Sequence, residues 1–300
     1  MKKLLLCIPF LSFSTPSHSI QIAQLTPSVD TLALSIKNPR QNPALTGKSR
    51  QIFIQNSSDV TATNISVSTT GLPSGTQISS TCTGQLNSGR ACSITISPGA
   101  HATSDCAAGT QPTAGVVTVT ADGGVTTEVR IYVLAYACQY QGGFIYSIDD
   151  TTPDTGSVGG NVVSLIDQIA PRSKMSGMVI QTWAAHAGVC SLKMNGYSDW
   201  RLPSICQMDA VYNDYKGCPS GAQSMSSSLS ILTGSPKHPC ILGHHCLTGP
   251  YWSSTEEHVP SLDAIDTAWG VNFDSEYGSN QVLARKDYQF GIRCSRSLIP

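Results

Sequence analysis

The chain has 300 residues, a formal net charge of −1 at pH 7, and charged side chains at only 12% of its composition. This length leaves room for one or two domains with a sizeable core. The near-neutral balance argues against a nucleic-acid-binding surface and against any partner held by general electrostatic attraction.

The first residues have the pattern of a secretory signal. Two lysines precede an apolar run from Leu4 to Phe13, and the small side chains of Ser17 and Ser19 follow it. This order is typical of a cleaved signal peptide. The apolar run is shorter than the roughly 18 residues that a membrane span needs. We therefore expect a signal peptide over residues 1–19, no transmembrane segment in the mature chain, and export to the periplasm, the cell surface or the medium.

The cysteines support export. Cys7 lies in the signal, and ten cysteines remain, four before residue 139 and six after it. An exported chain meets an oxidising compartment, so disulfides are expected in both groups. We expect the short-range pairs Cys82–Cys92 and Cys240–Cys246, and the sequence leaves the other pairings open. The remaining disulfide candidates are Cys106, Cys138, Cys190, Cys206, Cys218 and Cys294.

Residues 31 to 136 alternate apolar and polar side chains over short stretches, which is the pattern of half-buried strands. Turn signals such as Leu72-Pro73-Ser74-Gly75 separate these stretches. Regular short strands of this kind predict an all-β, immunoglobulin-like sandwich over residues 20–138, without a cluster of catalytic residue types. The predicted strands cover residues 51–55, 64–68, 91–96, 115–120 and 128–133.

Residues 139–300 mix predicted strands with short helices. Ser204 followed by Gln207 forms a capping box, which predicts a helix from Ile205 to about Tyr212. A second short helix is expected over 183–192, and the serine-rich stretch 224–232 is expected to be ordered because apolar residues are interleaved in it. A loop is expected over 149–160. The predicted strands are 143–148, 251–255, 268–273 and 288–294.

Several blocks of this second half also carry a family resemblance. An opening block, YQGGFIYSIDD at 140–150, precedes four others in a fixed order: GYSDWRLPS at 196–204, YWSST at 251–255, AWGVNF at 268–273 and FGIRC at 290–294. Together they resemble the ordered signature of the Lcl carboxy-terminal domain family, which is named for a collagen-like bacterial surface adhesin. The first half loosely resembles the Ig-like repeats of bacterial surface proteins.

The resemblance implies a C-type-lectin-like fold, similar to the core of formylglycine-generating enzymes. The expected fold class is therefore two domains: an all-β Ig-like sandwich over 20–138, followed by an α+β C-type-lectin-like module over 139–300. The chain lacks a Gly-X-Y repeat, so the trimeric stalk of the adhesin that names the family is not carried over.

A metal site is conceivable at residues 238–246, where His238, His244 and His245 lie close to two cysteines. The spacing matches none of the common structural zinc patterns, and an exported cysteine pair favours a disulfide loop. No metal is therefore expected, and the three histidines are weak candidates. Calcium is a second possibility, because acidic residues gather in the last third, but the short motifs of calcium-dependent lectins are absent and solvated loop charge is the simpler interpretation.

Ligand binding is expected on the late loops, since binding residues concentrate on loops. Trp200, Trp252 and Trp269 lie inside the signature blocks and are predicted to be core aromatics. The acidic balance of this half weakens a transfer of sulfated-glycan binding from the family's adhesin, because anionic ligands need clusters of Lys or Arg. The candidate ligand-binding residues are Glu256, His258, Asp274, Tyr277 and Arg285.

The function that these features favour is that of an exported or surface adhesin-like protein, which recognises a glycan or protein of a host cell, a matrix or an envelope. No catalytic residues or cofactor are assigned. Ser253-Ser254 with His258 lacks the glycine-rich elbow of a serine nucleophile. An enzyme related to the formylglycine-generating group is one alternative, although its reactive cysteine pair cannot be mapped here. A structural envelope protein is the other.

Overall fold

The computed structural model describes residues 21–106, 109–168, 183, 186–210, 215, 217–233, 240, 245–257, 267–275 and 278–300. The strands are β1 Leu25–Pro27, β2 Thr31–Ser35, β3 Lys37–Asn38, β4 Leu45–Thr46, β5 Arg50–Asn56, β6 Ala62–Thr70, β7 Gln77–Ser80, β8 Gly84–Leu86, β9 Ala91–Ser97, β10 Gly115–Ala121, β11 Val125–Leu134, β12 Gln139–Tyr140, β13 Gly143–Asp149, β14 Gly159–Ser164, β15 Pro250–Glu256, β16 Thr267–Ser275, β17 Gly278–Arg285 and β18 Ser295–Ser297. The helices are α1 His186–Cys190, α2 Ile205–Met208, α3 Met225–Ser228, α4 Ser230–Thr233 and the 3-10 turn η2 Asp122–Gly124.

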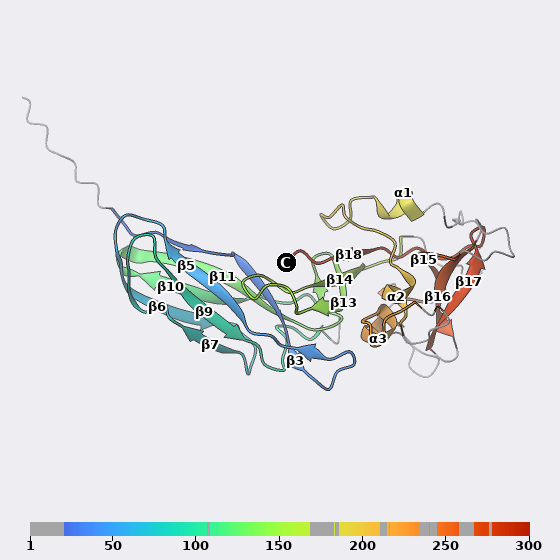
Figure 1. The fold of residues 1–300 in the computed structure, drawn as a ribbon, viewed down its shortest axis with the longest axis horizontal. Helices are drawn as coiled ribbons and strands as arrows, with labels where there is room; N and C mark the ends of the chain where they lie inside the picture. The colour runs from blue at the N-terminus through green and yellow to red at the C-terminus, as the bar shows by residue number, and fades with distance from the viewer. Residues whose placement is uncertain are drawn as a thin grey trace, which may run out of the picture.

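The first half is built from two sheets that pack face to face (Figure 1), with strand orders β1-β5-β9-β7 and β2-β11-β10-β6-β8. Alternation along β5 sets its two faces, since Ile52 and Ile54 are 0% exposed and Phe53 between them is 37% exposed. The five strands predicted from this alternation are confirmed as β5, β6, β9, β10 and β11. In the second sheet, β2 runs parallel to β11, whereas β10 runs antiparallel to both β11 and β6.

The second half contains two smaller sheets, β12-β13-β14-β18 and β15-β16-β17. The predicted α+β C-type-lectin-like module is wrong, because each described α-helix has only four or five residues. The capping box forms as predicted, with the Gln207 amide donating to Ser204 Oγ at 3.3 Å. However, Asp209 is extended, with a φ of −146°, so α2 stops after one turn. A single turn offers little apolar face, and such turns do not form a helical layer.

One late strand was predicted in the wrong place. Residues 288–294 form no strand among the described residues, and β17 over Gly278–Arg285 completes the sheet instead. The inward positions of β17 include Ser279 and Gln281, which are polar yet buried. Because these residues carry no hydrophobic alternation, the usual sequence signal for a strand is missing there.

The signature aromatics lie in the core, as predicted. Trp200, Trp252 and Trp269 are all buried. Trp252 stacks on Phe290, with 4.3 Å between the ring centroids. Offset stacking of this kind adds to the free energy of burial. These tryptophans therefore support packing and are not offered to a ligand.

All ten cysteines after the predicted signal form disulfides, and each pair lies within its own half of the chain. Both predicted short-range pairs are confirmed. Five disulfides indicate that the protein folds in an oxidising, exported environment. Across the described residues, no helix combines the length and hydropathy needed to cross a bilayer. The pairs are Cys82–Cys92, Cys106–Cys138, Cys190–Cys294, Cys206–Cys218 and Cys240–Cys246.

Candidate functional site

A cleft of about 550 Å³ opens where the sandwich meets the residues that follow it. Its volume lies within the range of roughly 300–1,000 Å³ that is typical of small-ligand sites. One wall comes from the sandwich and the other from the β12–β13 hairpin and the turn at 195–197. We call it the tyrosine cleft. Its lining residues are Thr31, Gln111, Pro112, Tyr132, Gln139, Tyr140, Gln141, Gly142, Gly143, Leu165, Asn195 and Tyr197.

Three tyrosines give the cleft its aromatic character. Tyr132 of β11 and Tyr140 of β12 have ring centroids 5.3 Å apart, at an interplanar angle of 54°. The Arg296 guanidinium carbon lies 3.8 Å from the centroid of the Tyr197 ring. Arg296 is fully buried, and its Nε donates to Asp199 Oδ1 at 2.8 Å. This cation–π contact holds the Tyr197 ring in place.

The wall beside Tyr197 consists of two tight turns that pack against each other. Gly142 has a φ of +86°, a left-handed conformation that only glycine adopts without strain. A Cβ atom at this position would lie 3.1 Å from Tyr197 Cδ2, so glycine also permits the close approach. The Asn195 side chain donates from Nδ2 to the Gly142 carbonyl at 2.8 Å and ties the turns together.

The polar lining of the cleft is made of amides and hydroxyls. None of its lining residues is an Asp, Glu, Lys, Arg or His. Within the described residues, no hydrogen bond engages the side-chain amides of Gln111 and Gln139, so both are available to a ligand. The cleft therefore offers aromatic faces, amide donors and amide acceptors, without a formal charge.

The phenol of Tyr140 is shielded from solvent by its surroundings in the cleft. Burial raises the pKa of the Tyr140 phenol to about 12, the neighbouring hydroxyls of Tyr132 and Tyr197 add to this rise, and a hydrogen bond with Gln141 opposes it. An exposed tyrosine titrates near 10. At neutral pH the phenol of Tyr140 is accordingly protonated and able to donate a hydrogen bond.

This shift gives a testable titration. When the phenolate absorbance of a Tyr140→Phe variant is subtracted from that of the native chain over a pH series, the difference should have its midpoint near 12. Because the folded pKa exceeds the unfolded one, the stability due to this group is fully present below about pH 10 and is lost as the pH rises towards 12. A midpoint near 10 would show that Tyr140 is not enclosed in the cleft.

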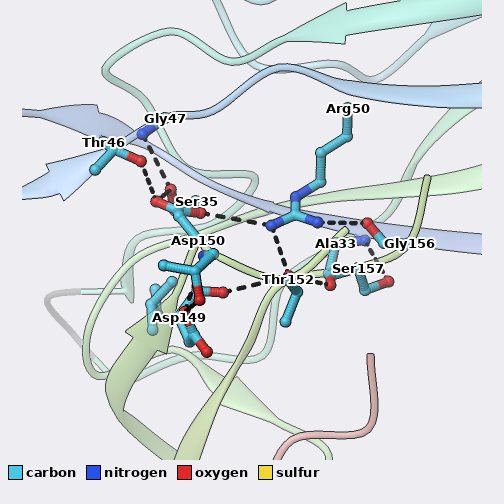
Figure 2. Close-up of polar contacts among 12 residues, drawn as sticks. Ala33, Ser35, Thr46, Gly47, Arg50, Asp149, Asp150, Thr152, Gly156 and Ser157 are labelled. Atoms are coloured by element: carbon cyan, nitrogen blue, oxygen red, sulfur yellow. Dashed lines mark hydrogen bonds and ion pairs between the residues drawn. The ribbon is translucent and has the colours of Figure 1, made fainter. Parts of the chain in front are cut away.

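A polar joint fixes the sandwich to the second half of the chain, and Figure 2 shows its contacts. Arg50, at the start of β5, is fully buried. Its Nη1 donates to the Pro153 carbonyl at 2.8 Å and to the Gly156 carbonyl at 2.7 Å, and its Nη2 donates to Thr152 Oγ1 at 2.9 Å. All three acceptors belong to the loop between β13 and β14, which thus grips a strand of the sandwich.

Asp150 completes this joint from the same loop. Its Oδ2 accepts hydrogen bonds from the Ser35 hydroxyl at 2.7 Å and from the Thr46 hydroxyl. The Asp150 carboxylate also lies 3.8 Å from Arg50 Nη2, so the buried guanidinium faces a partly buried opposite charge (Figure 2). We call Arg50, Asp150 and the loop 150–158 the joint.

Hydrogen bonds donated by backbone amides strengthen the joint. The Ala33 amide donates to Ser157 Oγ at 3.0 Å, and the Val158 amide donates to the Ala33 carbonyl at 3.0 Å. The Gln51 amide donates to the Asp154 carbonyl at 2.7 Å. These bonds tie β2 and β5 to the loop, so the two walls of the tyrosine cleft are held in a fixed relation.

Of the five ligand-binding residues predicted from the sequence, the structure describes the side chains of Glu256 and Arg285, and neither lines the tyrosine cleft. Glu256 and Arg285 lie at one end of the β15–β16–β17 sheet. Lys286 Nζ donates to Glu256 at 2.6 Å, and Arg285 pairs with Asp287 at 3.1 Å. Each of these two candidate side chains is therefore already paired with an opposite charge of this chain, which makes it less suited to bind a charged ligand. His258, Tyr277 and the side chain of Asp274 lie outside the described residues.

Of the three histidines that were weak metal candidates, the structure describes only His245. His238 and His244 lie outside the described residues, whereas the Nδ1 atom of His245 lies 2.6 Å from the Leu165 carbonyl. The ring of His245 also packs edge-on against Phe144, so it has a structural use. Within the described residues, no group of three or more His, Cys, Asp or Glu side chains could hold a metal ion.

Two groups weighed as possible catalytic elements also have structural uses. The Ser253 hydroxyl is buried and donates to the Trp269 carbonyl at 2.7 Å. The cysteines after the signal are all in disulfides, so none of them supplies a free thiol in this state.

The tyrosine cleft was not predicted from the sequence, although three of its residues belong to segments that were singled out there. Tyr140 and Tyr197 belong to two of the blocks that carry the family resemblance, and Tyr132 belongs to a predicted strand. A signal was present in the positive-φ turn at Gly142, since glycine pairs often mark close backbone approach. The convergence of the three rings depends on the way the two halves pack.

No family model matches the chain, and no curated protein matches it. Among solved structures, it is similar to the secreted serine protease VesC from Vibrio cholerae, with 10% identity, a TM-score of 0.28 and coverage of 91% of this chain and 46% of VesC. It is also similar to the adhesin InvE of Yersinia pseudotuberculosis, with 11% identity, a TM-score of 0.27 and coverage of 91% of this chain and 70% of InvE. The VesB protease of Vibrio cholerae aligns with 18% identity, a TM-score of 0.27 and coverage of 37% of this chain and 31% of VesB. The chain spans less than half of either protease, and TM-scores this low carry no argument about its fold or function.

Proposed function

We propose that the protein is an exported, adhesin-like binding protein that takes a glycan or protein ligand in the tyrosine cleft. The observation that carries this proposal is the convergence of Tyr132, Tyr140 and Tyr197 in a cleft of about 550 Å³. Tyrosine supplies a large contact area and a polar tip at a low cost in side-chain entropy. In this proposal the protein works in the periplasm, at the cell surface or outside the cell, and its partner belongs to a host cell, a matrix or the bacterial envelope.

Rigidity supports the proposal as well. A site that is ordered before the ligand arrives loses less entropy on binding than a flexible one. Arg296 fixes the Tyr197 ring, and the joint at Arg50 holds the two walls together. The cleft is thus preorganised on both sides. The resemblance to the Lcl family agrees with a surface binding role, without the lectin-like fold that it implied.

The test compares two tyrosine variants of the oxidised full-length chain. Tyr197→Ala removes a ring that lines the cleft, and Tyr288→Ala removes a tyrosine that is 55% exposed and lies outside it. Binding to glycan arrays and to whole host and bacterial cells should fall about tenfold or more for Tyr197→Ala, since losing ~1.4 kcal/mol of contact energy is a tenfold change. Tyr288→Ala should bind as the native chain does. Equal binding by both variants would refute the cleft as the site.

A further inference from the structure

We infer that the ligand of the tyrosine cleft is an uncharged oligosaccharide. This inference rests on the proposed function and names the class of ligand for the same site. The first observation is the absence of Asp, Glu, Lys, Arg and His from the lining residues of the cleft. A site for a sulfated or phosphorylated ligand uses Arg or Lys donors, which make charge-assisted hydrogen bonds to the anion.

The arginine that packs on a tyrosine of the cleft does not supply that missing charge. Arg296 lies behind the wall, is fully buried, and donates from Nη1 to the Gln141 carbonyl at 3.1 Å. Its Nε donates to the Asp199 carboxylate at 2.8 Å, which compensates the charge. The guanidinium therefore braces Tyr197 and Gln141 and is not presented to the cleft.

The chemistry that remains matches a neutral sugar. A pyranose ring has an apolar face of C–H groups, which packs on an aromatic face, and a rim of hydroxyls, each both donor and acceptor. Gln111 and Gln139 present both an amide donor and a carbonyl acceptor, which suits such a rim. The phenols of Tyr132, Tyr140 and Tyr197 supply aromatic surface and further hydroxyl donors.

The dimensions favour a sugar chain over a folded protein. A stable protein interface buries about 800 Å² on each partner, over a broad surface. The tyrosine cleft is instead a concave space of about 550 Å³ between two turns and the sandwich wall. A narrow chain of sugar rings can enter such a space, whereas the face of a globular domain cannot.

The experiment uses matched pairs of short oligosaccharides that differ only in O-sulfation, titrated against the oxidised full-length chain by calorimetry at low and high salt. We expect the neutral member of at least one pair to bind, with an affinity nearly independent of salt, because no ion pair is screened. Its sulfated partner should bind about tenfold or more weakly, since the cleft offers the anion no cation. Tyr197→Ala should reduce neutral binding by about tenfold, whereas Tyr288→Ala should leave it unchanged.

A variant that adds a charge at the rim of the cleft distinguishes the neutral-sugar inference from the proposed binding function of the cleft. Gln111 is exposed at the cleft, and Gln111→Lys adds a cation there with little risk to folding. Gln111→Lys also removes the amide that serves the sugar hydroxyls, so weaker binding of the neutral sugar together with a gain for the sulfated partner supports the inference. Stronger binding of the sulfated partner by the native chain, lost at high salt and in Tyr197→Ala, would overturn the neutral-sugar inference and leave the proposed function standing. If the chain binds a protein through Tyr197 and binds no sugar, the neutral-sugar inference is likewise overturned and the proposed function stands. If no probe binds in a way that depends on the cleft, the inference and the proposed function are both overturned.

Discussion

Replacing Arg293 with methionine should lower the free energy of unfolding by about 3–5 kcal/mol, which is the usual cost of removing one partner from a buried ion pair. Arg293 is 0% exposed, and its Nη1 donates to Asp167 Oδ1 at 2.8 Å. Its other nitrogens donate to the carbonyls of Ser164 and Leu165 at 2.8 Å and to that of His245 at 3.0 Å. Methionine would remove the countercharge of Asp167 and one donor from each of three carbonyl oxygens, and losing hydrogen bonds to buried acceptors is costly. Among the described residues, Asp167 would keep only the hydrogen bond from the Tyr251 hydroxyl, at 3.0 Å.

Urea unfolding of the oxidised chain measures this loss. Arg285→Met is the matched control, because Arg285 is 64% exposed in its ion pair with Asp287. Exposed ion pairs contribute only about 0–1 kcal/mol, so this variant should unfold close to the native midpoint. Arg293→Lys should recover little of the loss, since a lysine cannot donate in several fixed directions at once. A loss below ~1 kcal/mol for Arg293→Met would show that the hydrogen bonds and ion pair of Arg293 contribute little to the stability of this half.

Replacing Arg50 with methionine should loosen the joint and lower the free energy of unfolding by about 3 kcal/mol or more, because its hydrogen-bond and ion-pair partners would lose their donor. The carbonyls of Pro153 and Gly156 would lose their donor, and Asp150 would lose its buried countercharge. Because the joint holds both walls of the tyrosine cleft, the variant should also bind ligand more weakly than the native chain. The two effects together distinguish a loosened joint from a local defect in the sandwich.

Hydrogen exchange resolves this prediction to single amides. The amides of Ala33, Gln51 and Val158 make hydrogen bonds across the joint and should exchange faster in Arg50→Met. Amides between β10 and β11, which pair over seven residues inside the sandwich, should keep their protection. Arg40→Met is the control, since Arg40 is exposed and lies outside the joint. Unchanged exchange at all three joint amides would refute the assigned role of Arg50.

The strands of the sandwich could be predicted because their burial follows the sequence pattern directly. In β5 the apolar residues Ile52 and Ile54 point inward, and period-two alternation is the signal that a half-buried strand leaves in a sequence. The same rule missed β17, where Ser279 and Gln281 take inward positions. The start of α2 was also predictable, because the Ser204 capping box is a local interaction. Its length was not, since a cap marks only where a helix begins.

The candidate site was harder to predict because it depends on contacts between distant residues. Tyr132 and Tyr197 meet in one cleft only after the two halves pack. Arg50 and the loop to which it donates hydrogen bonds are about a hundred residues apart in the chain. No local sequence pattern predicts a contact between such distant residues. Glu256 and Arg285 were chosen as loop charges, but charge alone does not reveal that each has a neighbouring ion-pair partner.

The parallel pairing of β2 with β11 has a mechanical consequence. Thr31 at the start of β2 lies opposite Arg130, and Ser35 at its end lies opposite Leu134 at the end of β11. A pull on the chain before Thr31 and after Leu134 would slide the two strands past each other along their length. In this shear geometry the hydrogen bonds of the pair share the load and must yield together, whereas in an unzipping geometry they break one after another. A sandwich closed by such a strand pair is therefore expected to resist a pull applied across these two strands.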